Sequence, residues 1–287
     1  MFGIIGFVIV FGAVIGGALM AHVHLHVLWQ PNEIVVIFGA ALGAFIIANP
    51  ISVIKMSVKM VIHALTGGGP TKKDYLELMQ MMFQFFQALR KDGPQAVEQH
   101  VEKPKESSIF KAYPSFLKRH HAVDFFCDTM KITLSADLSQ YDVDDLLDGD
   151  IKVMHEEEHM AAHAVGNVAD AMPGLGIVAA VLGVVHTMGI LDQGTEAIGA
   201  AVAAALVGTL MGVLVCYGFV GPLATKMLKD VEADGRYLRV IKSGLVALQR
   251  GSPPLVCVES ARRTIYLTER PSFEEMDNAL KNAKKAA

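Results

Sequence analysis

The chain contains 287 residues, of which 52% are hydrophobic and 19% are charged, whereas a soluble domain carries about 25% charged residues. Its net charge of −4 and mean hydropathy of +0.40 exclude a strongly basic nucleic-acid-binding protein and an ordinary soluble globular domain. Three scattered cysteines, Cys127, Cys216 and Cys257, form no CxxC pair, which indicates reduced structural thiols without a disulfide framework.

Lysine and arginine avoid two stretches of the chain, residues 1–54 and 153–225, and these stretches hold all the long apolar runs. Four segments within them reach the roughly 20 residues that a membrane-spanning helix requires: 1–20, 34–53, 171–191 and 198–220. The connectors 21–33 and 192–197 contain neither lysine nor arginine. Because basic loops stay in the cytoplasm, we expect both connectors outside and both chain termini inside.

These observations predict an all-α integral membrane protein with four transmembrane helices and a large helical cytoplasmic domain. Residues 1–54 would hold the first two spans and a short periplasmic loop, and residues 55–170 would form the cytoplasmic helical domain. Residues 171–222 would hold the third and fourth spans, and residues 223–287 a cytoplasmic helical extension and tail.

The cytoplasmic segments show helical rather than strand patterns. Thr71 followed by Asp74 resembles a capping box, and apolar residues then recur at helical spacing from Leu76 to Leu89. Gly93, with the proline after it, predicts the end of that helix. Other elements are expected as helices over 123–134, 143–170 and 226–250, and as one short strand over 255–258.

The predicted spans are rich in small residues. Three pairs match GxxxG, namely Gly12/Gly16, Gly39/Gly43 and Gly208/Gly212. Small residues let helix backbones approach closely in lipid, so these faces can pack within one bundle or between copies of the chain.

The spans also contain no Asp or Glu at depth, because Glu33, Asp170, Asp192 and Glu196 are expected at or beyond their edges. Ion transport through a membrane usually needs an ionisable group inside it. His186 in the third span is the one candidate, and a lone histidine is more typical of hydrogen-bonded packing. If this protein conducts ions, we expect the carboxylate that carries them to come from another chain.

Residues 155–159 read HEEEH, which matches HExxH. On a helix this spacing places His155 and His159 on one face, with Glu156 as a possible general base and His163 extending the face. A membrane metalloprotease is therefore a remote alternative. A run of Glu and His on a polar cytoplasmic helix is more typical of a solvated face.

Five sequence segments, in order along the chain, resemble the MotA family of flagellar motor stator subunits, in its longer, proton-driven branch. They are QPNE (30–33) with IVVIFGAALGAFI (34–46), KPKESSIFKAYP (103–114), PGLGIVAAVLGVVHTMG (173–189), GTLMGVLVCYGFVGPLA (208–224) and ERPSFEE (269–275). The similarity runs nearly end to end and includes span order and loop sizes.

The resemblance implies a non-enzymatic, multi-pass protein of the bacterial inner membrane that converts proton flow into torque, with protons as its coupling ion and no other cofactor. Members of the family form a homopentameric ring around two copies of a MotB-type partner. That partner supplies one membrane helix with the proton-carrying aspartate, and the cytoplasmic heads push on the rotor protein FliG. The implied partners are thus these two proteins, further copies of the chain and membrane lipid, without nucleic acid.

Seven residues match functional positions of the family. Arg90 and Glu98 match charged head positions that meet the rotor, and Pro173 and Pro222 match prolines that couple proton binding to head movement. Positions on the ion path and the partner-facing helix match Ala180, Thr209 and Tyr217.

The residue at position 180 bears on the choice of ion. Sodium-driven relatives carry a hydroxyl residue at the position of Ala180. Because alanine offers no oxygen ligand to a hard cation, the resemblance favours protons. A TolQ- or ExbB-like proton-driven energiser remains an alternative, although those proteins have three spans and the charge pattern here indicates four.

Overall fold

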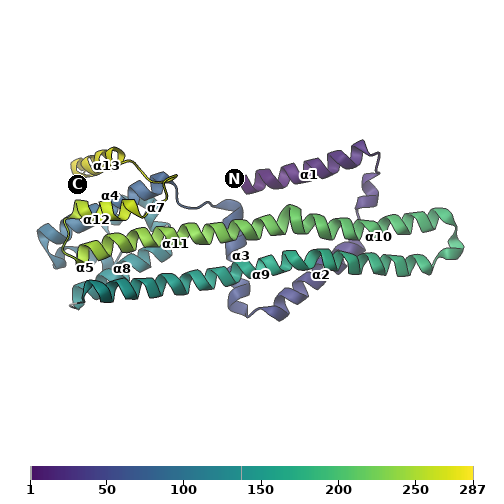
Figure 1. The fold of residues 1–287 in the computed structure, drawn as a ribbon, viewed down its shortest axis with the longest axis horizontal. Helices are drawn as coiled ribbons and strands as arrows, with labels where there is room; N and C mark the ends of the chain where they lie inside the picture. The colour runs from purple at the N-terminus through teal and green to yellow at the C-terminus, as the bar shows by residue number, and fades with distance from the viewer. Residues whose placement is uncertain (1, 137, 287) are drawn as a thin grey trace. The chain divides into compact units, whose positions relative to one another are not determined.

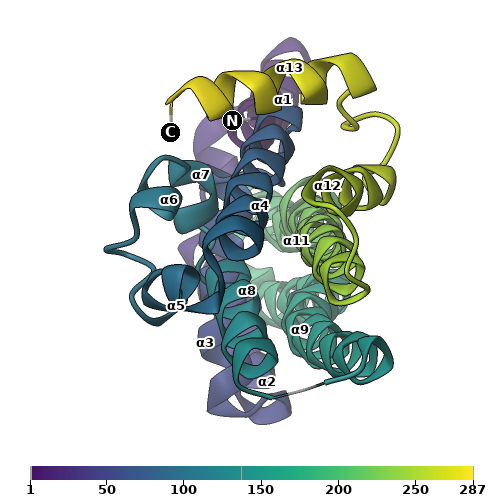
Figure 2. The same cartoon turned by 90° about the vertical axis from the view of Figure 1, so that its left-hand side faces the viewer.

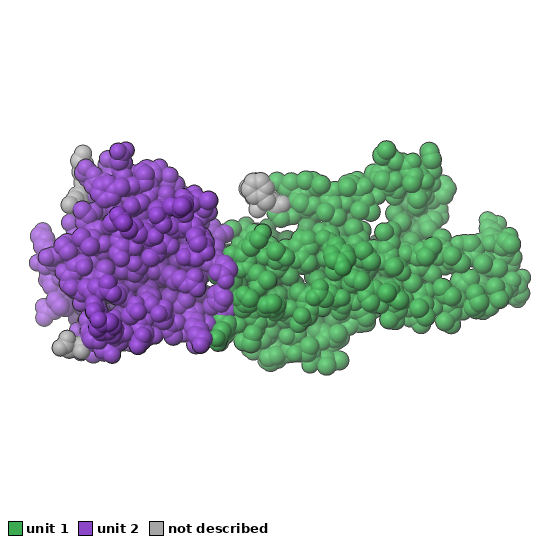
Figure 3. Space-filling view, viewed as in Figure 1, with its two compact units in different colours: residues 1–68, 156–231 green, residues 69–155, 232–287 purple. Residues whose placement is uncertain are grey.

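A computed structural model of the chain describes residues 2–136 and 138–286, in which helices are the only regular elements (Figure 1). The all-α prediction is therefore confirmed for these residues. The chain divides into two compact units, coloured separately in Figure 3. We call Met1–Gly68 with Glu156–Val231 the membrane unit, and Gly69–His155 with Glu232–Ala287 the head unit.

The membrane unit contains the helices that meet the length and apolarity needed to cross a bilayer. They are α1 (Phe2–Met20), η1 and α2 (Leu25–Leu28 and Pro31–Ala48), α9 (Gln140–Met188) and α10 (Thr195–Val215), the last continued by η3 (Cys216–Val220) and α11 (Gly221–Gln249). The predicted number of four spans is confirmed by length and composition. The turn η2 (Leu191–Gln193) joins α9 to α10 in a long hairpin (Figure 1).

The second predicted span ends earlier than expected. Residues 34–53 are divided between α2 and α3 (Ile51–Thr66), because Asn49 and Pro50 interrupt the helix. The residue before a proline avoids helical backbone angles, and Asn49 accordingly has an extended conformation. Its side-chain amide donates to the carbonyl of Phe45 at 2.8 Å and so satisfies one of the last carbonyls of α2.

Apolar side chains cover much of the outer surface of the membrane unit. Val8 and Ile9 on α1, Ile47 on α2, and Val185 and Leu206 on the α9–α10 hairpin are all exposed. In water such a surface would be costly, whereas in lipid it matches its surroundings. This surface is consistent with the span assignment.

The head unit is organised around α4 (Lys72–Asp92), seen near the centre of Figure 2. It contacts helices from both ends of the unit: α5 (Pro94–Glu102), α6 (Ser108–Lys111), α7 (Pro114–Leu117), α12 (Pro254–Arg263) and α13 (Phe273–Ala286). The predicted capping box at its start is confirmed, since Thr71 and Asp74 each accept a hydrogen bond from the backbone of the other. At its end Gly93 has φ +83°, a left-handed conformation that favours glycine.

An aromatic cluster forms the centre of the head unit. Phe126 on α8 (His120–Ser135) is fully buried, and its ring lies 5.0 Å from that of Phe85 and 6.1 Å from that of Phe116. Phe110 joins the same cluster, with its ring centre 6.0 Å from that of Phe126. These rings meet mostly edge to face, the arrangement that aromatic quadrupoles favour.

The predicted strand over 255–258 is wrong, because these residues lie in α12. Pro254 occupies the first turn of that helix, where a missing N–H is harmless. Cys257, Val258 and Ala261 are buried together on one helical face. The other predicted helices are confirmed: 123–134 lies in α8, 143–170 in α9, and 226–250 in α11 apart from its last residue.

Replacing Phe126 by alanine is expected to destabilise the head unit by about 3–5 kcal/mol, because a large buried side chain would leave a cavity. Amide hydrogen exchange of α4 and α8, followed by mass spectrometry on the purified chain, would measure the loss of local stability. Phe273→Ala, at a half-exposed position of α13, is the control and should change stability by no more than about 0.5 kcal/mol. Equal effects of the two substitutions would contradict this assignment of the core.

Candidate functional site

The hairpin of α9 and α10 is held by a contact between helix backbones. A Cβ atom on Gly212 would lie 2.6 Å from the carbonyl oxygen of Met172, and one on Gly176 would lie 2.9 Å from that of Gly208. No side chain larger than hydrogen fits at these positions without moving a helix. The Gly208/Gly212 pair therefore packs inside the bundle, whereas a Cβ added to either glycine of the 12/16 or 39/43 pairs would meet no other heavy atom within 4 Å.

The predicted ion-path residues lie beside this contact. A Cβ on Gly208 would lie 3.2 Å from the Cβ of Ala179, so the neighbouring residues Ala180 and Thr209 lie at the same level of the hairpin, and both are partly buried. Tyr217 is eight residues beyond Thr209, about 12 Å along the helix, and its side chain is 73% exposed. The structure brings the first two positions together and places the third further along the same helix.

A widened helical turn separates α10 from α11. Residues Cys216–Val220 form a π-helix, in which the N–H of Gly221 donates to the carbonyl of Cys216. Pro222 follows at once and lacks the N–H that would bond to the carbonyl of Gly218. Such π-turns are uncommon and frequently occur at functional sites. Sequence reasoning missed this turn and found only the proline beside it.

The second predicted coupling residue, Pro173, lies inside α9 without ending the helix. It cannot donate a hydrogen bond to Ala169, so the backbone ladder of α9 is weakened there. Met172, the preceding residue, supplies the carbonyl oxygen that approaches Gly212. Pro173 therefore lies directly beside the contact between α9 and α10, and Pro222 lies ten residues after Gly212.

Glu33, which was expected at the edge of the second span, is buried in the membrane unit. It lies in the first turn of α2, is 8% exposed, and its Oε2 atom has no hydrogen-bond partner. Its carboxyl group packs against Gly208, whose added Cβ would lie 2.7 Å from Oε2. Gly208 is 13 residues beyond Thr195, the first residue of α10, which is about 20 Å along the helix.

Pro31 is a sequence signal that Glu33 lies within a helix. Proline favours the first position of a helix, and α2 indeed begins at Pro31 rather than at residue 34. Glu33 is thus inside the helix and not in the connector before it. Only the packing of α2 on α10 shows that its side chain is buried.

The predicted rotor-facing residues are both exposed on the head unit. Arg90 lies in the last turn of α4, and Glu98 lies on α5, directly after the bend at Gly93. Two of the segments that resemble the family, 103–114 and 269–275, have structural roles in the head unit. Ser107 caps α6 by accepting from the N–H of Phe110, and the guanidinium of Arg270 donates to two backbone carbonyls before α13.

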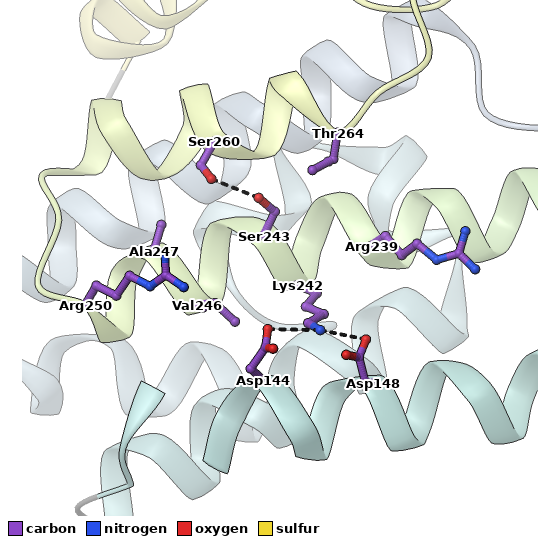
Figure 4. Close-up of a pocket in the computed structure, with 10 residues that line it drawn as sticks. All are labelled: Asp144, Asp148, Arg239, Lys242, Ser243, Val246, Ala247, Arg250, Ser260 and Thr264. Carbon is purple, nitrogen blue, oxygen red and sulfur yellow. Dashed lines mark hydrogen bonds and ion pairs between the residues drawn. The ribbon is translucent and has the colours of Figure 1, made fainter. Parts of the chain in front are cut away.

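The HEEEH segment and a polar pocket each bring ionisable groups together in the described residues. His155 Nε2 lies 2.9 Å from Glu232 Oε1 in the head unit. In the pocket of Figure 4, Lys242 on α11 forms ion pairs of 2.9 Å with Asp144 and 2.6 Å with Asp148 on α9. These pairs join α9 and α11 within the head unit.

Comparison with known proteins identifies the family. A family model described as "Motility protein A N-terminal" matches residues 4–93, and one described as "MotA/TolQ/ExbB proton channel family" matches residues 118–238. Motility protein A of Salmonella typhimurium is 35% identical over 274 residues, which cover 96% of this chain and 93% of the relative. The chain belongs to the motility protein A family.

Two further relatives agree with this assignment. Motility protein A of Escherichia coli is 34% identical over 98% of this chain and 95% of its own length. Chemotaxis protein LafT of Vibrio parahaemolyticus is 32% identical over 96% of this chain and 97% of its own length. None of the relatives named here is described as a peptidase.

Solved structures of the motility protein A type show the same fold. The C. jejuni MotAB structure has a TM-score of 0.76 at 18% identity and covers 94% of this chain and 98% of the matched chain. The flagellar MotAB stator complex from Bacillus subtilis has a TM-score of 0.75 at 21% identity, covering 96% and 98%. The four-span helical architecture is thus shared with motility protein A chains of low sequence identity.

Gly212→Ala is expected to destabilise this motility protein A chain by about 1–3 kcal/mol, because its methyl group would collide with backbone atoms of Met172 and Gly176. The thermal midpoint of the purified chain in detergent would measure the loss. Gly199→Ala on the same helix is the matched control, since its Cβ would meet nothing within 4 Å. A midpoint for Gly212→Ala equal to that of the control would show that α9 and α10 do not touch at this level.

Proposed function

We propose that the chain is a stator subunit of the bacterial flagellar motor and couples proton flow across the inner membrane to torque on the rotor. The observation that carries this proposal is similarity to motility protein A over 96% of the chain, on a structure with four candidate spans. The match of residues 4–93 to the motility protein A N-terminal model favours the stator over a TolQ- or ExbB-like energiser.

The partner is a MotB-type protein whose membrane helix supplies the proton-carrying aspartate. Both structural relatives are described as MotAB complexes. The hairpin of α9 and α10 offers a suitable face, because Thr209 and Ala180 are partly accessible and Tyr217 is largely exposed. Five copies of this hairpin would form the ring wall around the partner helices.

Coupling between ion passage and head movement would use the two proline positions. Pro173 and the π-turn before Pro222 weaken the helical hydrogen-bond ladder in α9 and at the α10–α11 junction. Both helices continue from the membrane unit into the head unit. A change in how α9 packs on α10 would therefore be transmitted along continuous helices.

Torque would be applied to FliG through the exposed charges of Arg90 and Glu98. Exposed charges at an interface act mainly by steering and weak pairing, so their effects should be additive and dependent on salt. Both residues lie near the bend between α4 and α5. The many basic residues of the head favour a cytoplasmic position for it and for both termini.

Expression of the chain with a MotB-type partner in a non-motile strain that lacks its own stator genes tests the function. We expect rotation of tethered cells to return only when both proteins are present, because the chain alone would lack the proton carrier. The chain without its partner, and the partner without the chain, are the controls. Paralysed cells with both proteins abundant in the membrane would contradict the stator proposal.

Motility supported by the chain should depend on protons and not on sodium. Ala180 offers no side-chain oxygen, whereas a sodium site needs several oxygen ligands. Swimming speed would be measured while sodium is replaced by potassium at fixed external pH. A speed that falls as sodium is removed would assign sodium as the coupling ion and overturn this part of the proposal.

A further inference from the structure

We propose that Glu33 is a proton-sensitive positioning residue of the transport cycle: its carboxyl group exchanges a proton with the outer aqueous phase, and its charge state sets how α2 packs against α10 beside Thr209. The inference rests on the stator function proposed above. It adds to the partner's aspartate a second titratable carboxyl group, which belongs to this chain itself.

The first argument is the burial of an unpartnered acid. Glu33 is 8% exposed, and its Oε2 atom has no hydrogen-bond partner in the described residues. Burying an ionised carboxylate without a partner costs several kcal/mol. Such groups are therefore usually neutral or have a functional role. A position needed for packing alone would be filled at lower cost by an apolar side chain.

The second argument is that the other ionisable groups of α2, α9 and α10 lie away from this carboxyl along their helices. On α10, Glu196 is the only ionisable residue, 12 positions before Gly208 and about 18 Å away along the helix. On α9, Asp170 and His186 lie nine positions before and seven positions after Ala179, about 14 Å and 10 Å along the helix. On α2 itself, Glu33 is the only ionisable residue. The short helix η1, which also contacts α10, carries His26, seven positions before Glu33. A charge on Glu33 would therefore find no partner within α2, α9 or α10 while α2 stays packed on α10.

The third argument is the place of the carboxyl group. It occupies the space left by the missing side chain of Gly208, the residue before Thr209, and the Cβ of Ala179, the residue before Ala180, borders the same space. The acid thus lies at the contact between α9 and α10, one residue from each of the two predicted ion-path positions. When its proton leaves, hydration of the carboxylate would favour separation of α2 from α10.

The step itself is a simple acid–base exchange. The carboxylate takes a proton from water at the outer side, where α2 begins, and returns it to water when the contact opens. No other reactant is needed. Since α2 starts only two residues before Glu33, the group is close to the connector 21–30 that links it to the outside.

The test is the rotation speed of single motors at low load, where ion transfer limits the rate, measured between about pH 6 and pH 8 outside the cell. Wild-type chain, Glu33→Gln and Glu33→Asp would each be expressed with the partner in a strain without its own stators. Glu196→Gln, an exposed carboxyl on α10, is the matched control. Abundance in the membrane and co-purification with the partner would be measured for every variant.

Glutamine has nearly the shape of the neutral acid but cannot release a proton. We therefore expect Glu33→Gln to assemble and to rotate at least about threefold more slowly at pH 8. The loss should be smaller at pH 6, where a larger share of the wild-type carboxyl groups carries a proton. Glu33→Asp should retain a pH-dependent speed with a displaced profile, and Glu196→Gln should match the wild type.

Wild-type speed of Glu33→Gln at both pH values, or an equal loss at both, would overturn the inference and leave Glu33 with a packing role. If Glu33→Gln does not accumulate, the Glu33→Asp profile decides: displacement from the wild type supports the proposal and superposition overturns it. Failure of the wild-type chain to rotate the motor would instead contradict the stator function, so the two proposals fail in different ways.

Discussion

The close approach of α9 and α10 is the constraint on which the membrane unit depends. Gly176, Gly208 and Gly212 bring backbone atoms of the two helices into contact, with no side chain between them. In lipid no hydrophobic force drives helices together, so close packing and interhelical polar contacts must supply the stabilisation. The positions predicted for the ion path, Ala180 and Thr209, each lie one residue from this contact, beside Ala179 and Gly208.

Two positions with a weakened helical hydrogen-bond ladder lie near this contact. Pro173 follows Met172, whose carbonyl approaches Gly212, and the π-turn of Cys216–Val220 begins four residues after Gly212. A rigid contact between two compliant helix segments concentrates bending at defined positions. Both α9 and α11 continue into the head unit.

Glu33 gives the membrane unit a chemical feature that its composition conceals. The chain was expected to depend wholly on another protein for a carboxylate at depth, yet one of its own carboxyl groups is buried against Gly208. The absence of a side chain at Gly208 leaves one space in which the carboxyl group of Glu33 on α2 and the Cβ of Ala179 on α9 both approach α10. The packing of three spans is therefore linked at a single residue.

The sequence by itself determined the four spans, the helical class and the start and end of α4. Span hydropathy, the distribution of basic residues, and the Thr71/Asp74 cap are local properties that act within one helix or one loop. The family resemblance also named Pro173, Pro222 and the ion-path positions. Their proximity to one another could not be read from spacing alone.

The tertiary structure decided which small residues are used, whether residues 255–258 form a strand or a helix, and where Glu33 lies. Of the three GxxxG pairs, only Gly208/Gly212 packs within the described chain, because only there does another helix backbone arrive at the same level. The short apolar run at 255–258 fits either period, and its packing in the head unit selects the helix. Glu33 is buried by residues about 145 to 175 positions away in the chain, a contact that no local pattern encodes.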